Sequence, residues 1–304
     1  MINKHKLWSR VFTYIPTPTA NDGESIDENA LRQVIDYQIE MGVDGICVLG
    51  STGGNGSFAD DEMKRITEVA SRHADGRIPI IVGTGARTTA ACIRLSKHAQ
   101  EVGCDGVMIL PVSYWPLTEN EVREHYERVA AAIRIPICVY NNPWTTGVDM
   151  KPEFLARLAK MDNISCIKES TGDLTRITSI RLLTDDQVAI IAGWESSSLQ
   201  AFMAGATGWA PVCTIFPPVS YGFLPCRGRR SRYNEGAHSL GQAFSTMRVY
   251  LQQISYSRGA YRPGPSGSFS RIAPAASANA GQRRSRVPGA YPARHRGEDP
   301  VRQL

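Results

Sequence analysis

Residues 45–53 read Gly-Ile-Cys-Val-Leu-Gly-Ser-Thr-Gly, a short apolar run that ends in a turn of glycine and hydroxyl residues. Such a run is typical of a strand that is buried on both faces. From Val11 to Ala210 similar runs alternate with longer amphipathic stretches, and in residues 31–39 the apolar side chains recur with helical spacing. This alternation predicts repeated strand–helix units around a parallel sheet.

Eight strands are predicted in this part of the chain. They are residues 11–17, 45–49, 78–84, 106–110, 137–140, 164–168, 189–192 and 208–210. Eight parallel strands close a barrel, so we predict an α/β fold of the (β/α)8 TIM-barrel type. An open, doubly wound sheet shows the same alternation and is the structural alternative. The barrel is favoured because Gly, Pro or hydroxyl residues follow several strands directly, and in a barrel these loops converge on one face.

The charge of the chain divides it into two unlike parts. Residues 1–217 carry 20 Lys and Arg against 26 Asp and Glu, whereas residues 218–304 carry 14 against 3, and all 14 are arginines. We therefore predict a catalytic barrel over 1–217 and, in place of the closing helices, an atypical basic segment over 218–304 that is rich in Arg, Ser, Gly and Pro.

Three interpretations of the basic segment remain open. Its composition is typical of a disordered region, and it also matches an out-of-frame reading of GC-rich DNA, which suggests a frameshift near residues 213–225. Its arginines would alternatively supply phosphate contacts, so nucleic-acid binding is the non-enzymatic hypothesis. The acidic barrel and the lack of RNA-recognition motifs make that hypothesis the weaker one.

The spacing of the cysteines and histidines bears on the redox environment of the protein and on whether it binds a metal. The seven cysteines are widely spaced and contain no Cys-x-x-Cys pair, which indicates reduced residues in a cytoplasmic protein. We expect neither a signal peptide nor a membrane span, because no leader-like apolar run and no stretch of 18 apolar residues is present. No two histidines have metal-ligand spacing, so we expect no metal and no other cofactor.

The most informative residue is Lys168, which ends the apolar run Ile164-Ser165-Cys166-Ile167. Burial at a strand end disfavours an ammonium, and the neutral amine is a nucleophile that attacks a ketone to give an iminium. A lysine that reaches solvent or pairs with Glu169 is the alternative interpretation.

Two further groups fall at neighbouring strand ends. Tyr140 ends the preceding strand, and because adjacent strands lie roughly 5 Å apart its phenol can reach the amine of Lys168 and move protons. A core tyrosine with a satisfied hydroxyl is the alternative. The turn Gly50-Ser51-Thr52-Gly53-Gly54 offers amide and hydroxyl groups that can hold a carboxylate.

The order of these motifs resembles the dihydrodipicolinate synthase and N-acetylneuraminate lyase family of Schiff-base-forming pyruvate aldolases. Gly-Ser-Thr-Gly follows the second strand, Tyr-Asn-x-Pro with Thr-Gly follows the fifth, and Ile-Lys-Glu ends the sixth, within a similarity from about Val11 to Phe216. The resemblance implies an imine between Lys168 and pyruvate or a pyruvate-derived 2-keto acid.

The same resemblance implies roles for the other site residues. Tyr140 would shuttle protons, and Ser51 and Thr52, in the turn with Gly53, would hold the substrate carboxylate and relay a proton. Gly193, after the seventh strand, matches the family's glycine near the imine. The resemblance also implies a homotetramer that acts on a small 2-keto acid.

Departures from the family pattern bear on the substrate. The synthases of the family carry an arginine two residues after the proline of Tyr-Asn-x-Pro, whereas this chain has Thr145 there. Ser113 stands where they have a tyrosine that crosses a subunit interface. A threonine hydroxyl does not replace a bidentate guanidinium clamp on a carboxylate. We therefore favour an aldolase or dehydratase acting on a 2-keto-3-deoxy sugar acid over 4-hydroxy-tetrahydrodipicolinate synthase, the alternative function.

Overall fold

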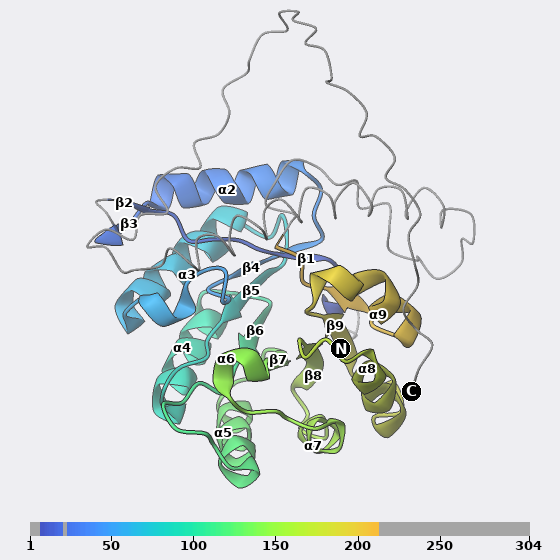
Figure 1. Ribbon diagram of the computed structural model, residues 1–304. Helices are drawn as coiled ribbons and strands as arrows, with labels where there is room; N and C mark the ends of the chain where they lie inside the picture. Colours follow the sequence, from blue (N-terminus) through green and yellow to red (C-terminus); the bar gives the residue numbers. More distant parts are fainter. Residues whose placement is uncertain (1–6, 21–22, 213–304) are drawn as a thin grey trace, which may run out of the picture. The chain divides into compact units, whose positions relative to one another are not determined.

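A computed structural model describes residues 7–20 and 23–212 of the chain. Eight parallel strands form one sheet in the order β1-β4-β5-β6-β7-β8-β9-β10, so each strand lies beside the next one along the chain (Figure 1). Their bounds are β1 Phe12–Tyr14, β4 Gly45–Val48, β5 Ile80–Gly83, β6 Gly106–Ile109, β7 Ile137–Asn141, β8 Ile164–Glu169, β9 Ala189–Ala192 and β10 Gly208–Trp209. A parallel bridge between Val11 and Trp209 joins the last strand to the first and closes the barrel.

The helices lie outside the ring of strands and connect each strand to the next (Figure 1). They are α2 Glu28–Glu40, α3 Asp60–Ala74, α4 Thr89–Glu101, α5 Glu119–Ala132, the short α6 Pro143–Thr146, α7 Pro152–Leu158, α8 Leu174–Leu183 and α9 Ser198–Ala204, with 3₁₀ turns η2 Asn55–Ser57 and η3 Glu195–Ser197. Within residues 7–20 and 23–212, no helix has the length and apolarity that a membrane crossing requires.

Side-chain caps start several of the helices where the chain leaves the sheet. The carboxylate of Asp27 accepts from the backbone N–H of Ala30 at the start of α2, and Thr118 and Glu121 form a reciprocal capping box at the start of α5. Each cap satisfies backbone donors that a helix terminus leaves unpaired. The polar residues of these loops therefore turn the chain from strand to helix at the end of the barrel where the strands' carboxyl ends lie.

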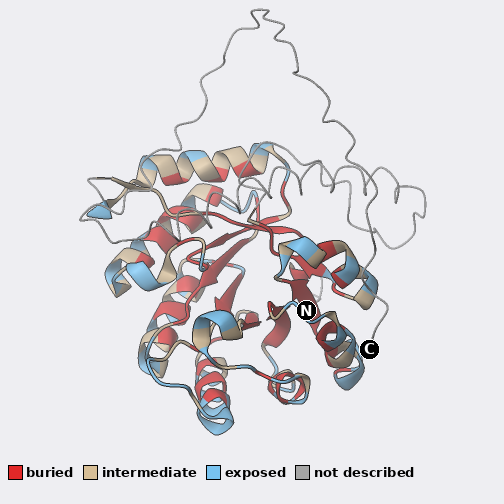
Figure 2. Cartoon of the chain, in the orientation of Figure 1, coloured by how far each residue is buried: buried red, intermediate tan, exposed pale blue. Residues whose placement is uncertain are grey.

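The eight strands of the barrel are buried (Figure 2). Their two faces contribute to two apolar layers. Outward side chains such as Ile46, Val139 and Ile167 pack against the helices in the larger layer. Inward side chains such as Cys47 and Ile81 fill the barrel itself. Alternation of direction along each strand assigns neighbouring residues to different layers.

The amino end of the barrel is filled by Trp8, which is buried. Its indole nitrogen donates to the hydroxyl of Ser165 on β8 at 2.9 Å, and the ring lies against Phe12 on β1 with centroids 5.8 Å apart. Gly106 on β6 leaves room for the ring, because a Cβ there would lie 3.1 Å from two indole carbons. One side chain thus joins strands that are not neighbours in the sheet.

The predicted (β/α)8 barrel is confirmed, and the open-sheet alternative is wrong because β10 and the segment before β1 meet. All eight predicted strands exist, but those predicted over 11–17 and 78–84 are shorter, since β1 spans only Phe12–Tyr14 and β5 only Ile80–Gly83. The two-stranded antiparallel sheet of β2 Thr19–Ala20 and β3 Ser25–Ile26 was not predicted. The predictions for residues 218–304, including the domain boundary at 217, lie outside the described residues.

Candidate active site

Lys168 lies near the carboxyl end of β8, and its side chain points into the barrel. It is paired in register with Tyr140 of β7, and its Nζ lies 4.2 Å from the centroid of the Tyr140 ring. On the other side Nζ lies 3.7 Å from the centroid of the Tyr14 ring on β1. Only 6% of Lys168 is exposed. The amine is therefore held between two aromatic faces at the end of the barrel opposite Trp8.

Glu169, the next residue, does not pair with Lys168 and points outward. Its carboxylate accepts from the side-chain amide of Asn141 at 3.0 Å and from the backbone N–H of Thr171 at 2.8 Å. It also forms an ion pair with Arg176 of α8, in which Nε and Oε2 are 3.4 Å apart. The alternative interpretation of Lys168 as the partner of Glu169 is wrong, because alternation along the strand sends the two side chains to opposite faces. Among the described residues, no carboxylate forms an ion pair with Nζ.

Tyr14 is a site residue that sequence reasoning missed. It is buried, and its hydroxyl donates to the sulfur of Met108 at 3.3 Å. Burial, with further contributions from Cys47 and Cys138, raises the pKa of the Tyr14 phenol well above its usual value. The phenol therefore stays neutral at physiological pH. The sequence offered one signal for Tyr14. It lies two residues after Phe12 in the first strand, so both side chains point to the same face, the interior of the barrel.

Three thiols line the barrel beneath the amine. Cys47, Cys138 and Cys166 are buried and free, and Cys138 and Cys166 are register partners on β7 and β8. Burial raises the pKa of Cys47 to about 12 and that of Cys166 well above its usual value. Because thiols with such pKa values remain protonated at neutral pH, Cys47 and Cys166 carry no thiolate charge.

Gly193, directly after β9, borders the Lys168 side chain. A Cβ at this position would lie 3.1 Å from Cε of Lys168 and 1.9 Å from the hydroxyl oxygen of Ser170. The hydroxyl of Ser170 is buried and has no hydrogen-bond partner in the described structure. A buried hydroxyl without a partner costs free energy, so its presence beside the amine indicates a place for a polar ligand group. Sequence reasoning named Gly193 but missed Ser170.

The turn after β4 lies at the same end of the barrel. Ser51 is exposed, Thr52 is half-buried, and Gly53 is buried. Neither side-chain hydroxyl forms a hydrogen bond with another described residue. Leu49, just before the turn, has a left-handed φ of 55°. Non-glycine residues with such φ values store strain and cluster at functional sites.

Gly50 lets this turn pack closely against Tyr14, the neighbour of Lys168. A Cβ on Gly50 would lie 2.8 Å from the ring of Tyr14, which in turn contacts Lys168. The structure thus brings Lys168 and Tyr140 together directly and connects the turn to them through Tyr14. Thr145 lies on α6 and is exposed.

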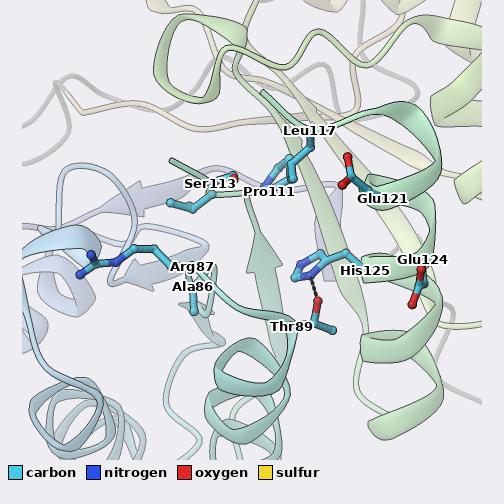
Figure 3. A pocket seen from close by; sticks show the side chains of 10 residues that line it. Ala86, Arg87, Thr89, Pro111, Ser113, Leu117, Glu121, Glu124 and His125 are labelled. Carbon is cyan, nitrogen blue, oxygen red and sulfur yellow. Dashed lines mark hydrogen bonds between the residues drawn. The ribbon is translucent and has the colours of Figure 1, made fainter. Parts of the chain in front are cut away.

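A cavity of about 200 Å³ lies between the loop after β5 and helix α5 (Figure 3). Arg87, Ser113, Glu121 and His125 contribute to its lining, whereas Lys168, Tyr140 and Ser51 do not. Burial, with a smaller contribution from Arg128, lowers the pKa of His125, whose Nδ1 lies 2.9 Å from the hydroxyl of Thr89.

Metal ligands were sought over the described ranges, 7–20 and 23–212. No group of three or more His, Cys, Asp or Glu side chains is arranged there to hold a metal ion. The expectation that the chain uses neither a metal nor another cofactor stays a prediction.

Comparisons with known proteins agree with this geometry. Residues 7–224 match the model of the dihydrodipicolinate synthetase family. The chain is 39% identical to 4-hydroxy-tetrahydrodipicolinate synthase of Syntrophus aciditrophicus over 210 aligned residues. The aligned region covers 69% of this chain and 72% of the relative. Among solved structures it is similar to dihydrodipicolinate synthase from Acinetobacter baumannii complexed with pyruvate, with 31% identity, a TM-score of 0.65, and 69% and 71% of the two chains covered.

A second solved structure extends the similarity. YagE, a prophage protein of E. coli K12 in complex with pyruvate, aligns with a TM-score of 0.74 and 27% identity over 80% of this chain and 83% of its own. The barrel, the matched residues and these relatives lead to one conclusion: the chain belongs to the dihydrodipicolinate synthetase family and is an enzyme of that family, a lyase.

Proposed function

We infer that this protein is a Schiff-base-forming lyase in which Lys168 forms an imine with pyruvate or a 2-keto-3-deoxy sugar acid. The observation that carries the proposal is the buried amine of Lys168 at the carboxyl end of the barrel, between Tyr14 and Tyr140, where no carboxylate of the described part of the chain pairs with it. Catalytic groups of this fold lie at that end. Two solved relatives are complexes with pyruvate, the simplest 2-keto acid.

In the proposed reaction the amine attacks C2 of the keto acid, and loss of water gives the iminium. Tyr140, whose ring lies beside the amine, gives and takes protons during these steps. Ser51 and Thr52 hold the carboxylate with their free hydroxyls and the amides of the turn that continues through Gly53, and Ser51 relays a proton. The phenolate of Tyr140 then takes the proton of the C4 hydroxyl, the C3–C4 bond breaks, and its electrons pass to the iminium. The C4 fragment leaves as an aldehyde, and the enamine of pyruvate that remains on Lys168 is protonated at C3 and hydrolysed.

A hydroxylated substrate is favoured by the surroundings of the amine. The hydroxyl of Ser170 has no hydrogen-bond partner within residues 7–20 and 23–212 and lies next to Gly193, whose missing side chain leaves space beside Lys168. A substrate hydroxyl would satisfy Ser170. Thr145 offers a hydroxyl on α6 but no positive charge for a second carboxylate.

Borohydride reduction in the presence of pyruvate, followed by peptide mass mapping, tests the imine. We expect one adduct, on Lys168, and none in the Lys168→Met variant. An adduct on another lysine, or none on folded wild-type protein, would contradict the proposal. A panel of 2-keto-3-deoxy sugar acids then identifies the substrate by the pyruvate that is released.

The second candidate function is 4-hydroxy-tetrahydrodipicolinate synthase, which condenses pyruvate with aspartate semialdehyde. It is favoured by the relatives that carry this name at 32–39% identity. The two candidates share the imine on Lys168 and differ in the aldehyde. Turnover with aspartate semialdehyde, in the absence of activity on sugar acids, would select the synthase.

Three further predictions accompany the proposal. A homotetramer is expected from the family and is checked by light scattering of the purified protein. Fractionation of cells would test the cytoplasmic location. Nucleic-acid binding through residues 218–304 is the non-enzymatic alternative, and filter binding at low and moderate salt tests it, because phosphate contacts weaken steeply as salt rises.

A further inference from the structure

Asn142 makes the hydrogen bond that orients the Tyr140 hydroxyl. Its side-chain nitrogen donates to the phenol oxygen at 3.0 Å, and among the described residues this is the hydroxyl's partner. Because the phenol oxygen accepts this bond, its own hydrogen remains free to point elsewhere. Asn142 lies only two residues beyond Tyr140, so the contact links the end of β7 to the start of the loop that follows.

The position of Asn142 in the fold makes this contact unexpected. Asn142 is the N-cap residue of α6, where an asparagine side chain ordinarily accepts from a backbone N–H of the first helical turn. No such side-chain bond is made here; the backbone carbonyl of Asn142 alone accepts from Thr145 and Thr146, at 3.1 Å each. The side chain therefore forgoes the local capping bond and binds the phenol instead. Departures from local rules are typical of functional sites.

We propose that Asn142 is a positioning residue that keeps the Tyr140 hydrogen directed toward the groups bound on Lys168. This inference rests on the proposed imine chemistry. Lys168 is the register partner of Tyr140, and its Nζ lies beside the Tyr140 ring, so atoms joined to Nζ are close to the phenol. With the Asn142 amide on one side of the oxygen, the phenol hydrogen faces the substrate.

The proton balance shows what the amide adds. When the carbinolamine loses water, Tyr140 gives its proton to the departing hydroxyl and becomes a phenolate, while the iminium forms. The phenolate then takes a proton from C3, which gives the enamine and restores the phenol. Between the two transfers the Asn142 N–H stabilises the negative oxygen, and hydrogen bonds to charged groups are stronger than neutral ones.

Deuterium exchange at C3 of pyruvate in heavy water measures this cycle without any aldehyde partner. We expect Asn142→Leu, which removes the donor at similar size, to lower the maximal exchange rate by roughly tenfold to a hundredfold. The pyruvate concentration at half-maximal borohydride trapping on Lys168 should stay within about twofold of the wild-type value, because imine affinity does not depend on the amide.

Asn142→Asp separates positioning from a merely structural role. A carboxylate of the same shape would accept the phenol hydrogen and oppose a phenolate, so exchange should fall further than in Asn142→Leu. A structural role predicts the reverse order, because aspartate is the closer replacement. Asn120→Leu and Asn120→Asp, at an exposed position of α5, are matched controls that should exchange like wild type.

Circular dichroism and thermal unfolding of each variant separate loss of fold from loss of chemistry. Exchange at the wild-type rate in both folded Asn142 variants, with normal trapping on Lys168, would overturn the positioning role and leave the proposed function standing. Exchange that is slower in Asn142→Leu than in Asn142→Asp would overturn it as well. Absence of any pyruvate adduct on wild-type Lys168 would overturn the proposed function and the inference with it.

Discussion

Replacing Arg176 by methionine should destabilise the barrel at the strand that carries Lys168. Arg176 is 9% exposed at its side chain and Glu169 2%, so their ion pair is shielded from water. Arg176 also pairs with Asp149 at 2.9 Å and donates to the carbonyl oxygen of Met150. The variant keeps much of the buried volume but removes the only cation that faces Glu169 in the described contacts.

The expected cost follows from what remains around Glu169. Breaking a buried ion pair by removing one partner costs about 3–5 kcal/mol. Glu169 keeps its bonds from Asn141 and Thr171, so we expect the lower end, about 3 kcal/mol. Asp149 is one-third exposed at its side chain and adds less than about 1 kcal/mol. A loss of this size lowers the melting temperature by roughly 6–12 °C.

A double-mutant cycle measured by urea unfolding tests the origin of this cost. Glu169→Gln alone should cost about 2 kcal/mol, and the double variant about 2 kcal/mol less than the sum of the single variants, because neighbouring partners are coupled. Arg123→Met, which breaks an exposed pair with Glu127, is the matched control and should cost under about 1 kcal/mol. Additive costs for Arg176 and Glu169 would refute the reasoning.

The remaining predictions concern the site and its surroundings. Gly193→Ala should lower pyruvate exchange at least tenfold, because the new methyl group displaces Ser170 and presses on Lys168; wild-type exchange would contradict the geometry. Thr145→Arg should raise condensation with aspartate semialdehyde, since a guanidinium binds a carboxylate; a coupled assay measures it, and no gain would count against the substrate argument. Burial lowers the pKa of His125 in the folded state below its usual 6.5. The melting temperature of the wild type should therefore fall as pH drops below 6.5, and that of His125→Phe should fall less. Equal falls in melting temperature between pH 7 and 5 would exclude this histidine as the cause.

The number and type of the strands were predictable because the barrel repeats one pattern. Apolar runs such as residues 189–192 end at turn residues, and the predicted and observed strands coincide there. The first strand was predicted too long. Apolar residues extend beyond Tyr14 in the sequence, but ladder pairing stops there because the chain turns toward β2.

The chemistry of the site was only partly predictable. Lys168 and Tyr140 were named because both end strands, and their exact pairing is a matter of register, which spacing along one chain does not determine. Tyr14 was missed because its contact with Lys168 depends on barrel closure, which places β1 across the interior from β8. Ser170 was missed for a related reason, since an unpartnered hydroxyl is visible only once its neighbours are placed.

Trp8 closes the amino end of a barrel whose interior is filled by side chains such as Cys47 and Ile81. Its indole lies between β1, β6 and β8 at that end, so within the described residues Lys168 is approached from the carboxyl end of the barrel. The water expelled when an imine forms must leave by the path through which the keto acid entered, before a second reactant can arrive. Such a layout imposes an order on arrivals and departures at the carboxyl end.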